Sequence, residues 1–313
     1  MTDTVLITGA AGFAGSHLVE LLARSGPVTA WHRSAPPPQL ASIATWQHVD
    51  LLDRAAVRTA MIALRPSRVY HCAGSPHVAR SWHDTATSLR SNVIGTHHLL
   101  EALGAIGERA RVLIPGSAAV YAPSQDPIAE DHPCAPASPY ALSKLAQEQL
   151  GGRASTEDGL DVILTRSFNH TGPRQTPAFA APSMARQVAL IERGLMEPVI
   201  KAGNLGARRD FTDVRDVARA YAGLMERGVP GTIYNVASGV GHTIQSVLDG
   251  LIARARVTVR VESEPGRMRP HDIPVLVGDP ARLWHATGWT AAISFDRMLD
   301  DLLDYWRETE RLL

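Results

Sequence analysis

The segment that most constrains the fold of this chain is a glycine-rich turn near the N-terminus. Val5–Ile7 is a short apolar run, Gly9, Gly12 and Gly15 follow it at regular spacing, and an amphipathic stretch begins at Ser16. Strand, glycine turn and helix in this order leave the helix N-terminus open, with backbone N–H groups and a positive dipole end facing outward. The chain is therefore predicted to begin with a strand–turn–helix unit that can receive an anion.

The first half of the chain alternates short apolar runs with helix-length amphipathic ones. Strands are predicted at residues 5–8, 28–31, 46–49, 68–72, 112–115 and 162–165. Helices are predicted between them at residues 15–25, 53–64, 88–106 and 140–151, and later at 183–193, 213–226 and the C-terminus. This alternation predicts an α/β fold, a Rossmann-type doubly wound parallel sheet, and its loosening after about residue 166 predicts a smaller α/β C-terminal domain. We expect a dinucleotide-binding domain of residues 1–166 plus about 209–238, and a second domain of about 167–208 and 239–313.

Composition narrows the function classes. The 313 residues carry 31 basic and 31 acidic side chains, so there is no basic surface of the kind that binds nucleic acid or anionic membranes. Only two cysteines occur, without metal-ligand spacing, and no apolar run approaches the length of a membrane span. The chain starts directly with a predicted strand and has no signal-peptide pattern. We expect a cytoplasmic protein that binds no metal, nucleic acid or membrane.

The glycine turn has the spacing of a dinucleotide-binding motif. Gly9 allows the tight turn, Gly12 lets the backbone approach a pyrophosphate, and Gly15 allows close packing of helix on sheet. The predicted cofactor contacts are Gly9, Gly12, Phe13, Ala14 and Gly15 in the turn and at the helix start, Ala73 and Gly74 after the strand at 68–72, and Asn92 in the helix at 88–106. Asparagine is unfavourable in a helix interior. Asn92 is therefore expected either to organise water or backbone near Lys144 or to have a structural role.

Cofactor preference is predicted from the end of the second strand. Sites specific for NAD usually carry an acidic residue there, on the ribose 2′-hydroxyl. This chain has Trp31-His32-Arg33-Ser34 and no carboxylate. The planar guanidinium of Arg33, with His32 beside it, suits a 2′-phosphate. NADP(H) is therefore favoured and NAD(H) remains an alternative. Asp50 and Leu51, after the third strand, are predicted either to contact the adenine side or to serve as a cap.

Three residues carry the predicted chemistry: Ser117, Tyr140 and Lys144. On a helix Tyr140 and Lys144 share a face, one turn apart. An ordinary phenol, with a pKa of about 10, is a poor acid near neutral pH, and Lys144 is expected to lower that pKa jointly with the cationic nicotinamide of the oxidised cofactor. Tyr140 would protonate a carbonyl oxygen as hydride arrives at carbon, while Ser117 would hydrogen-bond the same oxygen. Tyr140 and Lys144 would also contact the cofactor.

Over nearly its whole length the chain resembles the extended short-chain dehydrogenase/reductase family. The resemblance rests on the glycine turn, Tyr140 to Lys144, and the segments 71–74, 92–96 and 117–121. Segments 166–173, 203–216 and 267–280 are similar to the branch that contains GDP-mannose 4,6-dehydratase and GDP-4-keto-6-deoxy-mannose reductase. The resemblance implies a nucleotide-sugar substrate in the C-terminal domain. It also implies a homodimer formed through the helices that bear Asn92 and Tyr140.

Residue 119 separates the two activities of that branch. The dehydratases carry a glutamate at this position, which removes water across C5–C6, and this chain has Ala119. A methyl group cannot transfer a proton, so we expect a reductase that reduces the C4 ketone of a GDP-4-keto-6-deoxyhexose to a GDP-6-deoxyhexose. The alternatives are a nucleotide-sugar 4-epimerase, a GDP-mannose 4,6-dehydratase and a non-catalytic NADP-binding regulator.

By resemblance, the substrate contacts are expected in the second half of the chain. The predicted substrate-binding residues are His77, Ser117, Asn169, Lys201, Arg209 and Arg269, with Arg174 as a further candidate. Arginine suits a diphosphate because its guanidinium makes two charge-assisted hydrogen bonds at once. The alternative for each arginine is a surface ion pair.

Overall fold

A parallel sheet forms the centre of the computed structural model, which describes residues 4–106, 110–264 and 273–311. Within these residues, seven strands pair in a single sheet with every neighbouring pair parallel. Their spatial order is β10 (Ile233–Val236), β6 (Asp161–Ser167), β5 (Arg111–Ser117), β4 (Arg68–His71), β1 (Val5–Thr8), β2 (Val28–His32) and β3 (Thr45–His48). The order reverses between β1 and β4, and ligands bind at such reversal points in doubly wound folds.

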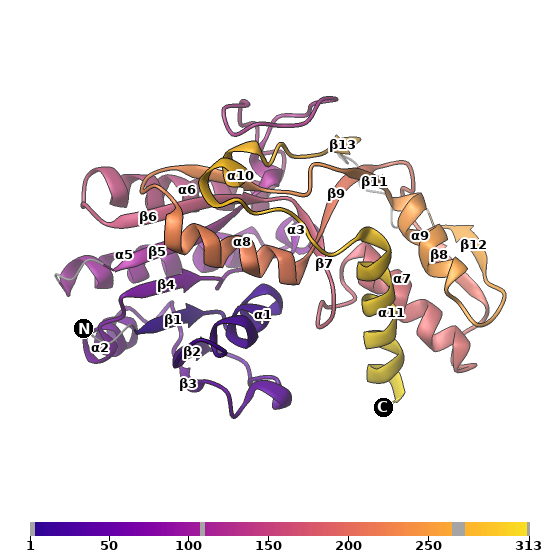
Figure 1. The fold of residues 1–313 in the computed structure, drawn as a ribbon, viewed down its shortest axis with the longest axis horizontal. Coiled ribbons are helices and arrows are strands. Elements are labelled where there is room, and N and C mark those ends of the chain that lie inside the picture. Colours follow the sequence, from indigo (N-terminus) through magenta and orange to yellow (C-terminus); the bar gives the residue numbers. More distant parts are fainter. Residues whose placement is uncertain (1–3, 107–109, 265–272, 312–313) are drawn as a thin grey trace.

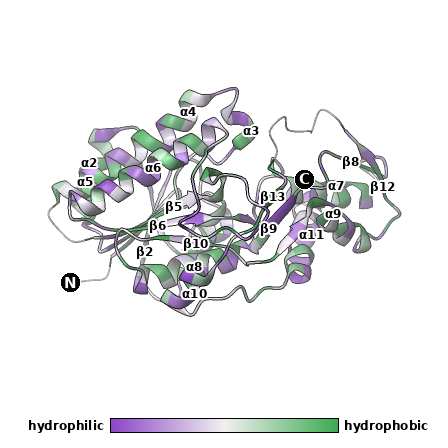
Figure 2. Cartoon of the chain, turned by 90° about the horizontal axis from the view of Figure 1, so that it is seen from above, coloured by the Kyte–Doolittle hydropathy of each residue, from purple (hydrophilic) through white to green (hydrophobic). Residues whose placement is uncertain are grey.

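Helices cover both faces of this sheet (Figure 1, Figure 2). One face packs against α1 (Phe13–Leu22), α8 (Val214–Arg227) and α10 (Ala281–Thr287). The other packs against α2 (Arg54–Leu64), α5 (Gly95–Ala105) and α6 (Pro139–Thr156). The central strand β1 is buried at all four residues, which is why it reads as a continuous apolar run. The predicted Rossmann-type sheet is confirmed.

A second part of the chain has its own core. Its helices are α7 (Ala180–Glu192), α9 (Ile244–Ala253) and α11 (Phe295–Arg311), beside the short strands β8 (Val199–Ala202) and β12 (Arg260–Ser263). A further small sheet contains β7 (Asn169–Thr171), β9 (Arg208–Asp213), β11 (Gly241–Thr243) and β13 (Val275–Leu276). This is the expected smaller α/β region; the domain boundaries assigned to it from the sequence stay a prediction.

The predicted helix at 88–106 is not a single α-helix. The chain forms α4 (Thr85–Leu89), a π-helical segment η2 (Arg90–Ile94) and then α5. The wider turn places the Asn92 side chain in the interior, where it is fully buried. Such π-helical segments are frequent at functional sites. Short elements that the sequence did not predict include η1 (Pro38–Leu40), α3 (Val78–Ser81) and η3 (Ala118–Val120).

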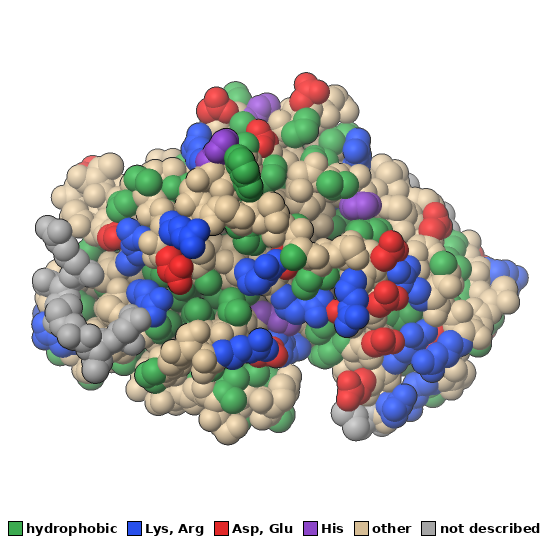
Figure 3. Space-filling model, viewed as in Figure 1, with side chains coloured by type: hydrophobic (Ala, Val, Ile, Leu, Met, Phe, Trp, Pro, Cys, Tyr) green, Lys and Arg blue, Asp and Glu red, His purple; other side chains and the backbone are tan. Residues whose placement is uncertain are grey.

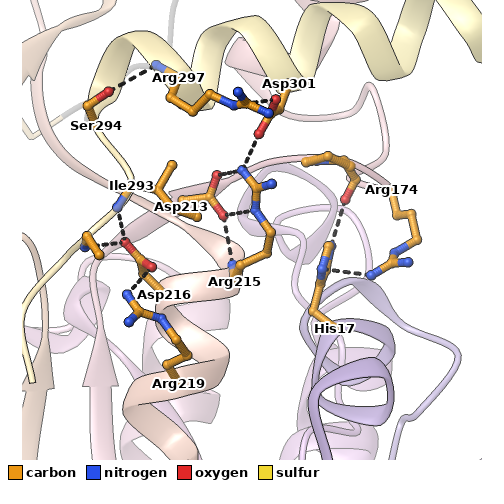
Figure 4. Close-up of polar contacts among 12 residues, drawn as sticks. His17, Arg174, Asp213, Arg215, Asp216, Arg219, Ile293, Ser294, Arg297 and Asp301 are labelled. Atoms are coloured by element: carbon orange, nitrogen blue, oxygen red, sulfur yellow. Dashed lines mark hydrogen bonds and ion pairs between the residues drawn. The ribbon is translucent and has the colours of Figure 1, made fainter. Parts of the chain in front are cut away.

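Charged side chains join the second region to the sheet (Figure 4). Arg215, at the start of α8, donates to Asp213 Oδ2 at 2.7 Å and to Asp301 Oδ2 of α11 at 2.6 Å. Asp216 accepts the backbone N–H of Ile293 at 2.8 Å. On the surface, side chains of both charges gather over α11 (Figure 3). These contacts fix α11 and the segment before it against α8, and therefore against the sheet.

A second contact joins α1 to the loop after β7. His17 Nε2 lies 2.9 Å from the carbonyl oxygen of Pro173, and Arg174 Nη2 lies 2.7 Å from His17 Nδ1 (Figure 4). Arg174 also pairs with Glu20 at 2.8 Å. Burial, followed by the charge of Arg174, lowers the pKa of His17 to about 4, so its ring is neutral. Because the carbonyl oxygen of Pro173 can only accept and Arg174 can only donate, the neutral ring of His17 carries its proton on Nε2 and accepts at Nδ1.

Candidate active site

The glycine turn has the geometry that its sequence predicts. Gly9 has φ of +65°, and a Cβ there would lie 2.6 Å from the backbone of Ala73. A Cβ at Gly15 would lie 2.3 Å from the carbonyl oxygen of Gly9, so helix and turn pack with no room for a side chain. Gly12 caps α1 without a side-chain hydrogen bond. The first N–H groups of α1 are therefore available to an anion.

A cavity of about 190 Å³ opens beside this turn. Seven predicted cofactor residues line it: Gly9, Gly12, Arg33, Asp50, Leu51, Ala73 and Gly74. The lining also includes His32 and residues that the sequence reasoning did not select, among them Ser34, Cys72 and Ser91. The glycine turn and the cavity beside it, which is lined from the ends of β1, β2 and β4, fit a dinucleotide. A larger cavity of about 330 Å³ beside α10 contains none of the predicted site residues.

The remaining predicted cofactor residues lie around the cavity. Phe13 stacks on His170 with ring centroids 5.7 Å apart, which holds the turn against β7. Arg33 is exposed and lines the cavity. The carboxylate of Asp50 accepts the N–H of Leu52 at 3.0 Å, and the cap of α2 is Asp53. Asp50 therefore shapes its own turn as well as lining the cavity.

Ser117 and Tyr140 meet at the C-terminal end of β5. Ser117 is the last residue of β5, and Tyr140 is in the first turn of α6, which begins at Pro139 after the cap Ser138. The backbone N–H of Tyr140 donates to Ser81 Oγ at 3.1 Å. Burial raises the pKa of the Tyr140 phenol above its ordinary value, and a hydrogen bond with Ser117 partly opposes this. Lys144 is not among the causes of this shift, and the lowering expected from Lys144 together with the oxidised nicotinamide stays a prediction.

Lys144 lies one turn further along α6 and is buried. Its ammonium donates to the carbonyl oxygen of Pro115 and to Oε1 of Gln147. Burial lowers the pKa of Lys144 to about 8, against smaller opposing effects of Cys72 and Glu148. Lys144 thus changes charge close to physiological pH, which an exposed lysine does not do.

Asn92 holds backbone beside the site and does not line the cavity. Its Oδ1 accepts the N–H of Ser75 at 2.7 Å, and its Nδ2 donates to Ser143 Oγ at 2.9 Å. Ser143 is the residue before Lys144 on α6. Of the two roles that the sequence left open, the contacts match the organisation of backbone near Lys144.

The predicted substrate residues lie on several elements. His77 stacks on Phe179 with centroids 5.4 Å apart, so the loop after β4 touches the segment before α7. Asn169 is exposed on β7 and pairs in register with Phe211 of β9, the strand that carries Arg209. Lys201 is exposed on β8, in a separate two-stranded sheet. Arg269 lies outside the described residues.

Two of the candidate arginines make hydrogen bonds within the chain. Arg174 binds His17 and Glu20 and so has a structural role in joining α1 to the loop after β7. Arg209 donates to the carbonyl oxygen of Arg208 at 2.9 Å, which holds its guanidinium along β9. Across the described ranges, no helix is long and apolar enough to cross a membrane, and no group of three His, Cys, Asp or Glu residues is placed to hold a metal ion.

Comparison with known proteins gives one consistent set of relatives. A family model described as GDP-mannose 4,6 dehydratase matches residues 6–302. The GDP-6-deoxy-D-mannose reductase of Pseudomonas aeruginosa is 35% identical over 314 residues, covering 99% of each chain. The solved structure of RMD from P. aeruginosa complexed with NADPH has a TM-score of 0.87 at 33% identity, covering 98% of this chain and 100% of that one. A UDP-glucose 4-epimerase of Thermus thermophilus in complex with NAD has a TM-score of 0.87 at 31% identity, covering 97% and 99%.

Proposed function

Because this chain belongs to the extended short-chain dehydrogenase/reductase family of nucleotide-sugar enzymes, we propose that it is an NADPH-dependent reductase of a GDP-4-keto-6-deoxyhexose. The product would be a GDP-6-deoxyhexose of the rhamnose or talose type. The observation that carries this choice is Ala119 beside an otherwise complete Ser117, Tyr140 and Lys144. The similarity to a GDP-6-deoxy-D-mannose reductase over the full length supports it.

The proposed reaction needs one proton and one hydrogen-bond donor from the protein. NADPH, when bound, supplies the hydride to C4. Tyr140 donates its proton to the C4 oxygen, and Ser117 donates a hydrogen bond to the same oxygen. The raised pKa of Tyr140 keeps the phenol protonated before the reaction, as an acid requires. The positive charge of Lys144, one turn away, stabilises the phenolate that remains.

The cofactor and substrate contacts are assigned on the same basis. The residues proposed to hold NADPH are Gly9, Gly12, Phe13, Ala14, Gly15, Arg33, Asp50, Leu51, Ala73 and Gly74. Arg33 would pair with the 2′-phosphate, and NADH would lack that contact. For the sugar nucleotide we propose His77, Asn169, Lys201, Arg209 and Arg269.

A nucleotide-sugar 4-epimerase is the second candidate, favoured by the similarity to the T. thermophilus epimerase. The two activities differ in net turnover. A reductase oxidises one NADPH for each ketone reduced, whereas an epimerase recycles its cofactor. GDP-, dTDP- and UDP-linked 4-keto-6-deoxy sugars should be supplied with NADPH or NADH, and the products identified by NMR. Interconversion of nucleotide sugars without cofactor consumption would refute the reductase, and dehydration of GDP-mannose would refute the argument from Ala119.

We also propose a homodimer that buries the outer face of α4, η2 and α6. Four large apolar side chains are exposed along these elements and the adjoining α3: Trp82 at 54%, Leu89 at 36%, Ile94 at 42% and Leu142 at 52%. Leu142→Glu should convert the dimer to a monomer in size-exclusion chromatography with light scattering. The matched control is Ile62→Glu, because Ile62 is 49% exposed on α2. A monomeric wild type, or equal effects of both variants, would contradict this proposal.

A further inference from the structure

A chain of buried polar side chains lies beneath the proposed site. It starts at Thr8, the last residue of β1, and ends at Lys144 on α6. His71 of β4, Thr96 of α5 and Gln147 of α6 lie between them. All five residues are buried. Buried polar groups are costly unless each one is paired, so a chain this complete constrains the orientation of its members.

The contacts run without interruption. Thr8 Oγ1 lies 2.8 Å from His71 Nδ1, and His71 Nε2 lies 2.8 Å from Thr96 Oγ1. Gln147 Nε2 donates to Thr96 Oγ1 at 2.7 Å, and Gln147 Oε1 accepts from Lys144. The last residue of the glycine-turn strand is thereby connected to the lysine of the proposed active site.

The direction of each hydrogen bond follows from Thr96. Its hydroxyl donates to the carbonyl oxygen of Asn92 at 2.7 Å, so toward His71 and Gln147 it can only accept. His71 must therefore carry its proton on Nε2. Gln147 must present its NH₂ group to Thr96, which turns its carbonyl oxygen toward Lys144. Burial lowers the pKa of His71 to about 3, consistent with a neutral ring.

We propose that Gln147 is a positioning residue for Lys144, and that neutral His71 fixes Gln147 through Thr96. An ammonium has three N–H donors. Gln147 and the carbonyl of Pro115 take two of them, so one is left for the phenol or a bound ligand. The part of this inference that concerns catalysis rests on the proposed function; the part that concerns the charge of Lys144 does not.

The charge of Lys144 should respond to Gln147 in a predictable direction. Among the described residues, the titratable groups that act on Lys144 or respond to its charge are Glu148 on α6, His71 at the end of β4 and Cys72 directly after it. Tyr140 lies one turn earlier on α6. Gln147→Glu adds a carboxylate at the ammonium, which should raise the Lys144 pKa by about 1 to 3 pH units. Gln147→Met replaces the amide with an apolar side chain of similar size. The ammonium loses this acceptor, so the pKa of Lys144 should fall by about 1 pH unit.

The composition of the chain makes this measurement direct. Only two lysines occur, Lys144 and Lys201, so ¹³Cε-lysine NMR of the full chain without cofactor gives two titrating signals. Lys201→Arg assigns them. Gln149→Glu and Gln149→Met are the matched controls, because Gln149 is exposed on the same helix, and they should leave the Lys144 signal within a few tenths of a pH unit. Shifts of opposite sign in the two Gln147 variants support the proposal.

Two outcomes would overturn it. One is a Lys144 titration that both Gln147 variants leave unchanged or move in the same direction, with circular dichroism reporting a folded chain. The other needs no Gln147 variant: it is a ¹⁵N NMR spectrum of the wild-type histidine rings that shows His71 protonated on Nδ1 instead of Nε2. Neither measurement uses a substrate, so a failure here is distinct from a failure of the proposed reductase activity.

Discussion

Replacing the proposed acid is the sharpest test of the site. Tyr140→Phe keeps the ring that α6 presents beside Ser117 and removes only the hydroxyl. Proton transfer by a positioned acid contributes about 10²- to 10⁴-fold to a rate. At 1.36 kcal/mol per tenfold change, this corresponds to a loss of about 3 to 5 kcal/mol of transition-state stabilisation. The loss should appear in kcat and in kcat/KM alike, because the proton moves only in the transition state.

Stability should change far less than activity. The hydroxyl of Tyr140 is hydrogen-bonded to Ser117, but burial also desolvates it, as its raised pKa reports. Removing one such hydroxyl loses a hydrogen bond of about 1 kcal/mol and relieves part of a desolvation cost. We therefore expect the free energy of unfolding to change by about 1 kcal/mol or less, and NADPH affinity to change by less than about threefold.

The assay is the loss of reduced-nicotinamide absorbance with a GDP-4-keto-6-deoxy sugar. Ser117→Ala should lose about 10²- to 10³-fold, as expected for one hydrogen-bond donor to the reacting oxygen. The double variant should lose less than the product of the two single losses, since both groups act on one atom. Tyr305→Phe on α11 is the control. A Tyr140→Phe enzyme with more than about a tenth of wild-type turnover would refute the assignment of the acid.

Charged groups give three further predictions. Because Lys144 has a pKa lowered to about 8 and acts as a cation, kcat/KM for NADPH should fall as the pH rises through about 8 and should level off below about 7. Arg166 and Glu148 form a buried ion pair at 2.7 Å, so Arg166→Met should lower the free energy of unfolding, measured in urea, by about 3 to 5 kcal/mol. The control is Asp161→Asn, which breaks the more exposed ion pair with Arg111 and should lower the free energy of unfolding by about 1 kcal/mol or less. Arg33→Ala should raise the Kd for NADPH about 10- to 100-fold by calorimetry and leave the Kd for NADH nearly unchanged, and equal losses for both cofactors would contradict the 2′-phosphate assignment.

The first half of the fold was predictable because its signals are strong and local. The inner strands β1 and β5 are buried along their apolar runs, and α1 and α2 are helices of at least ten residues that bury one apolar face. The short strands of the second region carry no such signal. β7 has three residues and pairs with β9 about forty residues later, so its existence depends on a partner that no local pattern indicates.

The positions of the proposed catalytic residues were predictable for a different reason. Ser117, Tyr140 and Lys144 have fixed spacing and meet where β5 and α6 adjoin, so the motif specifies the geometry. The pKa of Tyr140 was not predictable, because helical spacing does not say where the long Lys144 side chain points. Its ammonium lies against Gln147 and Pro115, and burial of the phenol then has the larger effect.

The use of lysine at position 144 has its own physical reason. Two of the 31 basic residues are lysines and the rest are arginines, which make the ion pairs described above. A guanidinium at position 144 would bring five N–H donors to a pocket whose acceptors are the oxygens of Pro115 and Gln147, so buried donors would be left unpaired. It would also stay charged at every accessible pH. An ammonium matches the two acceptors, keeps one donor for the site, and has a pKa that burial brings to about 8. In a chain whose basic residues are nearly all arginines, position 144 therefore favours lysine over arginine, because burial can shift the pKa of an ammonium toward neutral pH.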